Sequence, residues 1–148
     1  MHIREVTDNK KRYLPLLLLA DEQESMIDRY LGRGTMYVLE DNGVVKAECI
    51  VTDEGDGVLE IKSIAVDPAF QCRGYGRALV EFIAVEYRGK FDTLQVGTGE
   101  SPLTLSFYEA CGFERSHVVE DFFTDNYDHP IIEGGIRLKD MIYLQRRL

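Results

Sequence analysis

The strongest constraint on the fold is the stretch VLEIKSIAVDPAFQCRGYGR at residues 58–77. Its first half alternates apolar, β-prone residues with polar ones, which predicts a strand. The alternation breaks at Ser63, where we expect either a β-bulge or a close backbone approach. Asp67 and Pro68 end the strand because proline cannot donate to a sheet ladder. A glycine-containing turn then leads into a pattern with helical spacing.

That turn, QCRGYGR at residues 71–77, has the properties of an anion site. Two glycines let the backbone approach a ligand closely. The first amides of the following helix lack internal partners, and such an end suits a pyrophosphate. Arg73 and Arg77 add positive charge beside it. The alternative is a glycine-tolerant turn that binds nothing.

Two common phosphate loops are excluded. A dinucleotide fingerprint requires a third glycine three positions after the second, and Leu79 stands there; no Gly-Lys-Ser/Thr run exists for a Walker loop. The remaining pattern, Gln-x-x-Gly-x-Gly after Val-Asp-Pro, resembles the acyl-CoA loop of the GNAT superfamily of N-acetyltransferases. The run FYEACGF at residues 107–113 is similar to the second GNAT signature. The likeness is to small bacterial members sometimes labelled IAA acetyltransferases.

The order of the predicted elements is also that of the GNAT family. Periodicity predicts strands at residues 2–6, 35–40, 44–52, 58–66, 91–96, 113–123 and 141–146, and helices at 14–19 (capped by Asp8), 21–31, 76–87 and 103–111. Short turns make the second to fourth strands antiparallel, whereas a connecting helix makes the fourth and fifth parallel. The resemblance implies an α/β (α+β) fold. It has a mixed, mostly antiparallel seven-stranded sheet with splayed parallel strands 4 and 5, flanked by about four helices. We expect one domain over residues 1–148.

The composition limits the partners. With 26 acidic and 17 basic residues, the net charge of −9 disfavours nucleic acid and anionic membranes and favours a cationic partner. The amino-terminal end shows no secretory or transit pattern, and the apolar run at residues 14–20 is too short to span a bilayer. Three widely spaced cysteines indicate reduced thiols in a cytoplasm, and no spacing suggests a metal site.

The resemblance assigns residues to acetyl-CoA, the expected cosubstrate. The backbone of Ile64, Ala65 and Val66 would bond the pantetheine arm as an added strand. The amides that would hold the pyrophosphate belong to Gln71, Cys72, Arg73, Gly74, Tyr75, Gly76 and Arg77. Cys72 is expected to be a small packed residue and not an acyl carrier.

Three further residues have both a functional and a structural interpretation. Tyr108 would donate a proton to the leaving thiolate, or would be a core tyrosine beside Phe107 and Phe113. Phe107 itself is assigned to the cofactor site. Ser101 stands where many GNAT members carry an asparagine that bonds pantetheine. Its hydroxyl would cap the following helix, bond CoA, or do both, and we expect capping.

The acceptor amine needs a base. An alkylammonium has a pKa near 10.4, about 3 units above neutral pH, so a group must remove its proton before it attacks the thioester. Glu60, in the central strand, is the candidate by its position in the family motif. The alternative is a carboxylate on a solvated face, paired with Lys62. The transfer is expected to be direct, from thioester to amine.

The identity of the acceptor substrate is what the sequence constrains least. In GNAT proteins it binds between the first two helices and the loop before the last strand, here residues 22–33 and 126–136. Four acids in or next to the first of these regions either attract a cationic amine or form a solvated helix face: Asp21, Glu22, Glu24 and Asp28. Tyr127 and His129 either line the site or have no role in it. The resemblance implies an acetyl-CoA-dependent N-acetyltransferase acting on a small molecule or peptide. The alternatives are a CoA-binding sensor without turnover, or transfer to a hydroxyl or of another acyl group. A homodimer through the terminal strands stays open.

Overall fold

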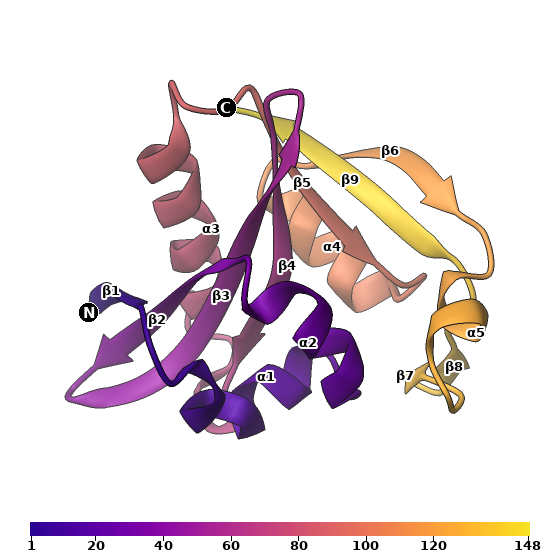
Figure 1. Ribbon diagram of the computed structural model, residues 1–148, viewed down its shortest axis with the longest axis horizontal. Helices are drawn as coiled ribbons and strands as arrows, with labels where there is room; N and C mark the ends of the chain where they lie inside the picture. Colours follow the sequence, from indigo (N-terminus) through magenta and orange to yellow (C-terminus); the bar gives the residue numbers. More distant parts are fainter.

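A twisted seven-stranded sheet carries the fold (Figure 1). The computed structural model describes every residue from Met1 to Leu148. The strands of the sheet are β1 (His2–Val6), β2 (Thr35–Asp41), β3 (Val44–Gly55), β4 (Val58–Val66), β5 (Thr93–Thr98), β6 (Glu114–Val119) and β9 (Met141–Arg147). Their order is β1-β2-β3-β4-β5-β9-β6, and only β4 and β5 are parallel. The expected mixed sheet with one parallel central pair is confirmed.

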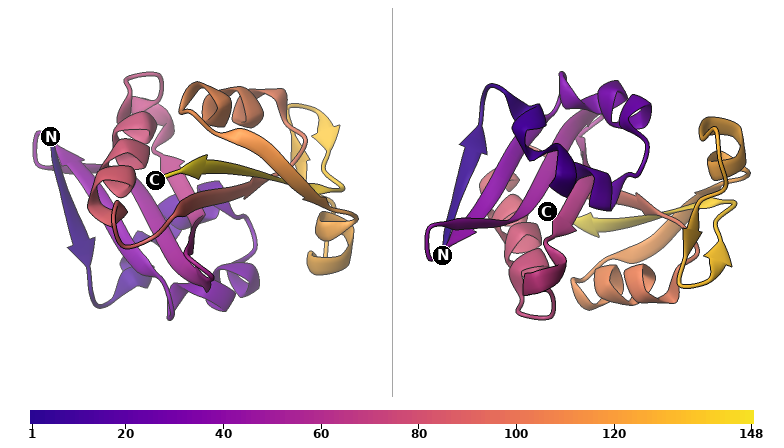
Figure 2. Two further views of the ribbon diagram at one scale, coloured as in Figure 1. Left: turned by 90° about the horizontal axis from the view of Figure 1, so that it is seen from above. Right: turned by 90° about the horizontal axis from the view of Figure 1, so that it is seen from below.

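Helices cover both faces of this sheet. They are α1 (Leu14–Ala20), α2 (Glu24–Leu31), α3 (Tyr75–Tyr87), α4 (Pro102–Ala110) and α5 (Phe122–Asn126). Figure 2 shows α3 and α4 on one face and α1 and α2 on the other. The larger apolar core lies under α3 and α4, and a second core lies under α1 and α2. None of the helices is both long and apolar enough to cross a bilayer.

The parallel strands part halfway along their length. Ladder pairing between β4 and β5 runs only from Val58–Thr93 to Ile61–Val96, although β4 continues to Val66. Beyond this point β4 keeps only its antiparallel neighbour β3. The two strands diverge in Figure 1, so the carboxyl end of β4 has a backbone edge that faces away from any strand. The predicted splay of these strands is confirmed.

A β-bulge lies at the point of divergence. Ile50 of β3 pairs with Ser63, whereas Val51 pairs with Ile61, so Lys62 is the extra residue. The break expected at Ser63 is therefore a bulge. Because side chains alternate along a strand, the extra residue moves Ser63 to the α1–α2 face, while Ile61 stays in the core under α3.

Several predicted boundaries were wrong. Asp8 caps no helix, because a 3-10 turn at Lys10–Tyr13 precedes α1, and α2 begins at Glu24, three residues later than predicted. The predicted strand at 113–123 ends at Val119. Asp121 takes a left-handed conformation that turns the chain, and Phe123 enters α5. A small core of Phe123, Ile131 and Leu138 holds this segment, and the β7–β8 hairpin (Ile132–Glu133 and Ile136–Arg137) lies between the last two of these residues.

Candidate active site

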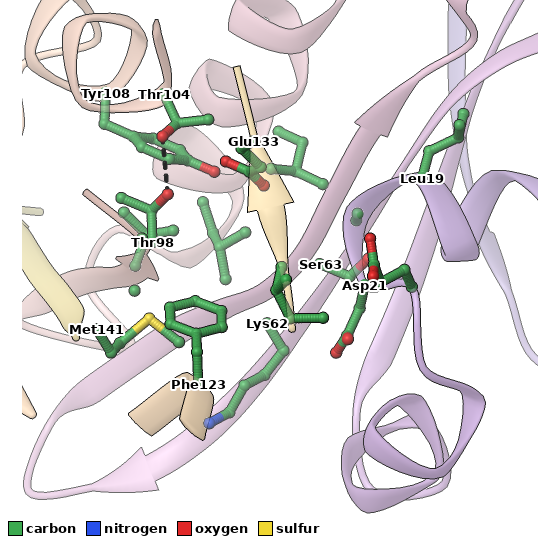
Figure 3. A pocket seen from close by; sticks show the side chains of 18 of the residues that line it. Leu19, Asp21, Lys62, Ser63, Thr98, Thr104, Tyr108, Phe123, Glu133 and Met141 are labelled. Atoms are coloured by element: carbon green, nitrogen blue, oxygen red, sulfur yellow. Dashed lines mark hydrogen bonds between the residues drawn. The ribbon is translucent and has the colours of Figure 1, made fainter. Parts of the chain in front are cut away.

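The gap between β4 and β5 opens into a cavity of about 220 Å³. Its walls are the carboxyl ends of these strands, the loop between α1 and α2, and side chains from α4, α5 and β7. Figure 3 shows Tyr108 and Thr104 of α4 on one side and Asp21 and Leu19 on the opposite side. Parallel sheets commonly bind ligands beyond the carboxyl ends of their strands, and this cavity has that position.

Tyr108 is both a packed residue and a cavity residue. Its ring makes edge contacts with Phe107 and Phe113, with centroids 5.1 and 5.8 Å away. The residue is only 7% exposed, yet it lines the cavity, and its hydroxyl points toward Glu133 (Figure 3). Burial, with nearby negative charge, raises the pKa of Tyr108 well above its usual value. The hydroxyl therefore keeps its proton near neutral pH and can donate it.

The predicted anion loop has a left-handed backbone at two positions. Cys72 has φ of 61° and Gly74 has φ of 83°, and Gly74 is the N-cap residue of α3. The expectation that Cys72 is packed was wrong, because this turn exposes its side chain. No side chain caps this helix, so its first amides face outward beside the exposed Arg73 and Arg77. This geometry can accept a pyrophosphate.

Gly76, the second glycine of the loop, is required for a different reason. A Cβ on Gly76 would lie 3.1 Å from the Phe107 ring, and its backbone is ordinary helix. Close packing between α3 and α4, and not ligand approach, therefore explains this position. The contact joins the two predicted signature motifs in space.

The end of β4 presents free backbone to the cavity. Ile64, Ala65 and Val66 pair with β3 on one edge, and β5 has already diverged from the other. The side chain of Gln71 donates a hydrogen bond of 3.2 Å to the Val66 carbonyl, which joins the anion loop to this strand end. An extended ligand can therefore add along this edge in the manner of a β-strand.

Ser101 does not act as predicted. It occupies the N-cap position of α4, but its hydroxyl makes no capping hydrogen bond. The local side-chain bond comes from Thr104, whose hydroxyl donates to the Ser101 carbonyl at 3.1 Å. Thr104 also accepts from the Thr98 hydroxyl at 2.9 Å, which holds the start of α4 against the end of β5 (Figure 3).

Glu60 is buried and fully engaged. It is 5% exposed and lines a second cavity of about 230 Å³, which shares Asp21, Lys62 and Tyr127 with the first. Its Oε1 accepts from Gln95 at 2.6 Å, and its Oε2 lies 2.8 Å from the Lys62 ammonium. The pairing with Lys62 is present, but the carboxylate is not on a solvated face. Neither oxygen is left without a partner.

A second buried acid escaped the sequence-based predictions. Glu48 of β3 is completely buried, and Ser63 donates a hydrogen bond of 2.6 Å to its Oε1. Its Oε2 has no partner. Burial raises the pKa of Glu48 to about 8. The sequence feature that could have revealed Glu48 is that it is a lone acid within the apolar run AECIV of a predicted strand.

The acids between the first two helices have different roles. Asp21 lines the cavity and accepts hydrogen bonds from Tyr127 at 2.7 Å and from Tyr30 at 3.3 Å. Burial raises its pKa. Glu22 also lines the cavity, and His129 bonds it at 2.8 Å. The loop before β7 is thus attached to the α1–α2 loop.

The other two acids, Glu24 and Asp28, lie on a solvated helix face, which was one of the two alternatives from the sequence. Glu24 and Asp28 both pair with Lys11 at 2.8 Å, and all three side chains are about half exposed. They line neither of the two cavities described above. Only Asp21 and Glu22 of this group, together with Glu133 from β7, give the first cavity its acidic wall.

Comparisons with known proteins agree with this geometry. Residues 32–115 match the family described as "Acetyltransferase (GNAT) domain". The uncharacterized N-acetyltransferase YvbK of Bacillus subtilis (strain 168) is 37% identical over 132 residues, which are 87% of this chain and 84% of YvbK. A GNAT family acetyltransferase from Elizabethkingia anophelis, solved with acetyl-CoA bound, is 34% identical with a TM-score of 0.94, covering 99% of this chain and 97% of that one. The IAA acetyltransferase from Bacillus cereus ATCC 14579 is 34% identical with a TM-score of 0.93, covering 99% of each chain.

The raised pKa of Glu48 predicts a pH-dependent stability. Between about pH 5 and pH 8 the folded chain holds one proton that the unfolded chain releases. The free energy of unfolding therefore falls as pH rises through this window, by up to about 1.4 kcal/mol per pH unit from this group. We expect Glu48→Gln to remove this slope, so that the variant gains stability over the wild type with rising pH. Urea unfolding at several pH values measures it.

Glu54→Gln is the matched control. Glu54 lies on the same strand, but it is partly exposed and pairs with Arg33. Its pKa is lowered, so its titration lies below this pH window. An unfolding free energy of Glu48→Gln that parallels the wild type at every pH would show that Glu48 is ionised throughout.

Proposed function

Because the chain belongs to the GNAT acetyltransferase family, and is thus an acyltransferase that uses acetyl-CoA, we propose that it moves an acetyl group directly from the thioester to a primary amine. The acceptor is an amine of a small molecule or peptide. The observation that carries the proposal is the Tyr108 hydroxyl, which retains its proton and lines the cavity where β4 and β5 part. A cytoplasmic location fits the three unpaired cysteines.

We assign the cosubstrate to the β4 edge and the loop that follows it. The pantetheine arm adds along Ile64–Val66, and the pyrophosphate lies on the amides that begin at Gln71. The open strand edge and the uncapped start of α3 support this placement. Similar proteins were solved with acetyl-CoA or CoA bound, at 34% and 33% identity.

The chemistry then needs two proton movements. The neutral amine attacks the thioester carbon, the C–S bond breaks, and Tyr108 donates its proton to the departing thiolate. Before this, the acceptor ammonium must lose a proton. Glu60 stays the sequence-based candidate for this role, but Gln95 and Lys62 engage both of its oxygens.

The acidic wall of the cavity favours a cationic acceptor. Asp21, Glu22 and Glu133 line the cavity, and its one lysine, Lys62, is paired with Glu60. A polyamine or an aminoglycoside has the positive charge that such a wall attracts.

The direct test is acceptor-dependent CoA release. Wild-type protein with acetyl-CoA is offered 1,4-diaminobutane, spermidine, kanamycin and a short peptide with a free amino terminus, and a thiol reagent reports free CoA. We expect at least one cationic amine to accelerate release and to appear acetylated by mass spectrometry. Tight acetyl-CoA binding without release for any amine would instead identify a CoA-binding sensor.

Tyr108→Phe tests the proton donor. We expect kcat to fall by about 10²-fold with an unchanged Kd for acetyl-CoA, because the variant loses the hydroxyl but keeps the ring contacts. Tyr87→Phe is the matched control, since Tyr87 bonds the Tyr37 hydroxyl and does not line the first cavity. Equal turnover by Tyr108→Phe and the wild type would remove Tyr108 from the mechanism.

Gly74→Ala tests the pyrophosphate loop. A side chain there has open space but must adopt a left-handed backbone, which costs roughly 1–2 kcal/mol and shifts the loop. We expect acetyl-CoA binding, measured by calorimetry, to weaken about tenfold. Gly43→Ala has the same strain and open space in the β2–β3 turn, and should lose stability while keeping its affinity. Equal affinities for both variants would contradict the assignment.

A further inference from the structure

We propose that Glu48 accepts the proton of the acceptor ammonium, and that the Ser63 hydroxyl transfers it. The inference rests on the proposed N-acetyltransferase function. Glu48 does not touch the substrate, because it is completely buried in β3 and does not line the cavity. Ser63 lines the cavity and donates its hydroxyl hydrogen to Glu48 Oε1 at 2.6 Å.

The carboxyl of Glu48 is unusual for a structural group. Nearly all buried polar atoms in proteins have a hydrogen-bond partner, and an unpaired buried carboxylate is costly. Here Oε2 has none, and Oε1 has only Ser63. A core position with purely packing duties would be occupied more favourably by an apolar residue. Proton transfer gives this acid a reason to be there.

The β-bulge aligns the relay. Since Lys62 is the extra residue, Ser63 faces the α1–α2 side of the sheet, where Glu48 also points. A hydroxyl has one hydrogen and two lone pairs. Ser63 uses the hydrogen on Glu48, and the Tyr30 hydroxyl also contacts the Ser63 side chain, so one lone pair of Ser63 is left for an N–H donor in the cavity.

The proposed step balances as two coupled proton transfers. An N–H bond of the ammonium breaks and its proton goes to Ser63 Oγ, while the Ser63 O–H bond breaks and that proton goes to the Glu48 carboxylate. The products are a neutral amine and a carboxylic acid, with Ser63 unchanged. After attack, the nitrogen gives its surplus proton to Tyr108, which has protonated the thiolate. Glu48 returns its proton to solvent when the products leave.

The surroundings of Glu48 favour proton acceptance over permanent charge. The titratable groups that act on or near it are Tyr30 from α2, Tyr108 from α4 and Cys49 on its own strand, and none is cationic. Asp21 is connected to the same region through its bond with Tyr30, and α1 contributes no ionisable side chain. Burial raises the pKa of Glu48 to about 8. This value is closer to the pKa of an alkylammonium than the pKa of an ordinary carboxyl is. A bound ammonium supplies the positive charge that the carboxylate lacks.

The test is the pH profile of kcat/KM with acetyl-CoA and 1,4-diaminobutane, from about pH 6 to about pH 10. In the wild type we expect activity to rise with pH and to level off above about 8. Glu48→Gln and Ser63→Ala should each lose at least about tenfold in kcat near pH 8, and their activity should no longer level off there but follow the free-amine fraction toward about pH 10. Their Kd for acetyl-CoA should match the wild type.

Conservative and matched variants separate the relay from a structural role. Ser63→Thr keeps a hydroxyl and should keep the limb, which a packing role for Ser63 does not predict. Glu54→Gln, on the same strand but outside the lining of both cavities, should keep it too. If Glu48→Gln does not fold, the Ser63→Ala and Ser63→Thr pair carries the test alone.

Two results would overturn the inference. One is an acidic limb that still levels off near pH 8 in both Glu48→Gln and Ser63→Ala while the wild type turns over. The other is a limb that disappears only in Glu60→Gln, which would assign the proton to Glu60. If the wild type acetylates neither the diamine nor the other amines above, the proposed function itself fails, and that failure is recognised before any variant is compared.

Discussion

The separation of β4 from β5 after the Ile61–Val96 pair is the constraint on which the rest of the site depends. A continuous parallel ladder would fill the backbone edge of Ile64–Val66 and close the cavity beneath Tyr108. Because the strands part, an extended ligand can replace the missing strand. The β9 strand keeps β5 in the sheet on its other side, and the Thr98–Thr104 bond holds α4 against its end. The gap is therefore a fixed feature of the fold.

The same point in β4 also distributes the polar groups. The bulge at Lys62 turns Ser63 toward Glu48, and leaves Lys62 beside Glu60. Two buried acids thus lie on one face of the sheet with different partners. Glu60 has a cation and an amide as partners, whereas Glu48 has one hydroxyl. A carboxyl bonded only to a hydroxyl is better suited to accept a proton than a carboxyl paired with a cation.

Much of the fold could be predicted from residues 58–77 and 107–113, since these motifs specify strand, turn and helix locally. A β-bulge was one of the two alternatives expected at Ser63, because alternation is a local property. Glu48 was missed although it is a lone acid in an apolar run, because its burial depends on α1 and α2 packing over β3, and the run alone does not report that packing. The capping role of Ser101 was wrong for a similar reason: Thr104 bonds its carbonyl, and rotamer choice is decided by packing. The prediction that the strand continues beyond Val119 was wrong because Asp121 adopts a left-handed backbone, which apolar periodicity does not predict.

A crystal structure of the wild-type protein with acetyl-CoA tests the central claim most directly. The pyrophosphate should lie on the amides at the start of α3, the pantetheine along the free edge of β4, and the thioester sulfur within hydrogen-bonding reach of the Tyr108 hydroxyl. A thioester that lies outside the gap between β4 and β5, or a pyrophosphate away from Gly74, would contradict it.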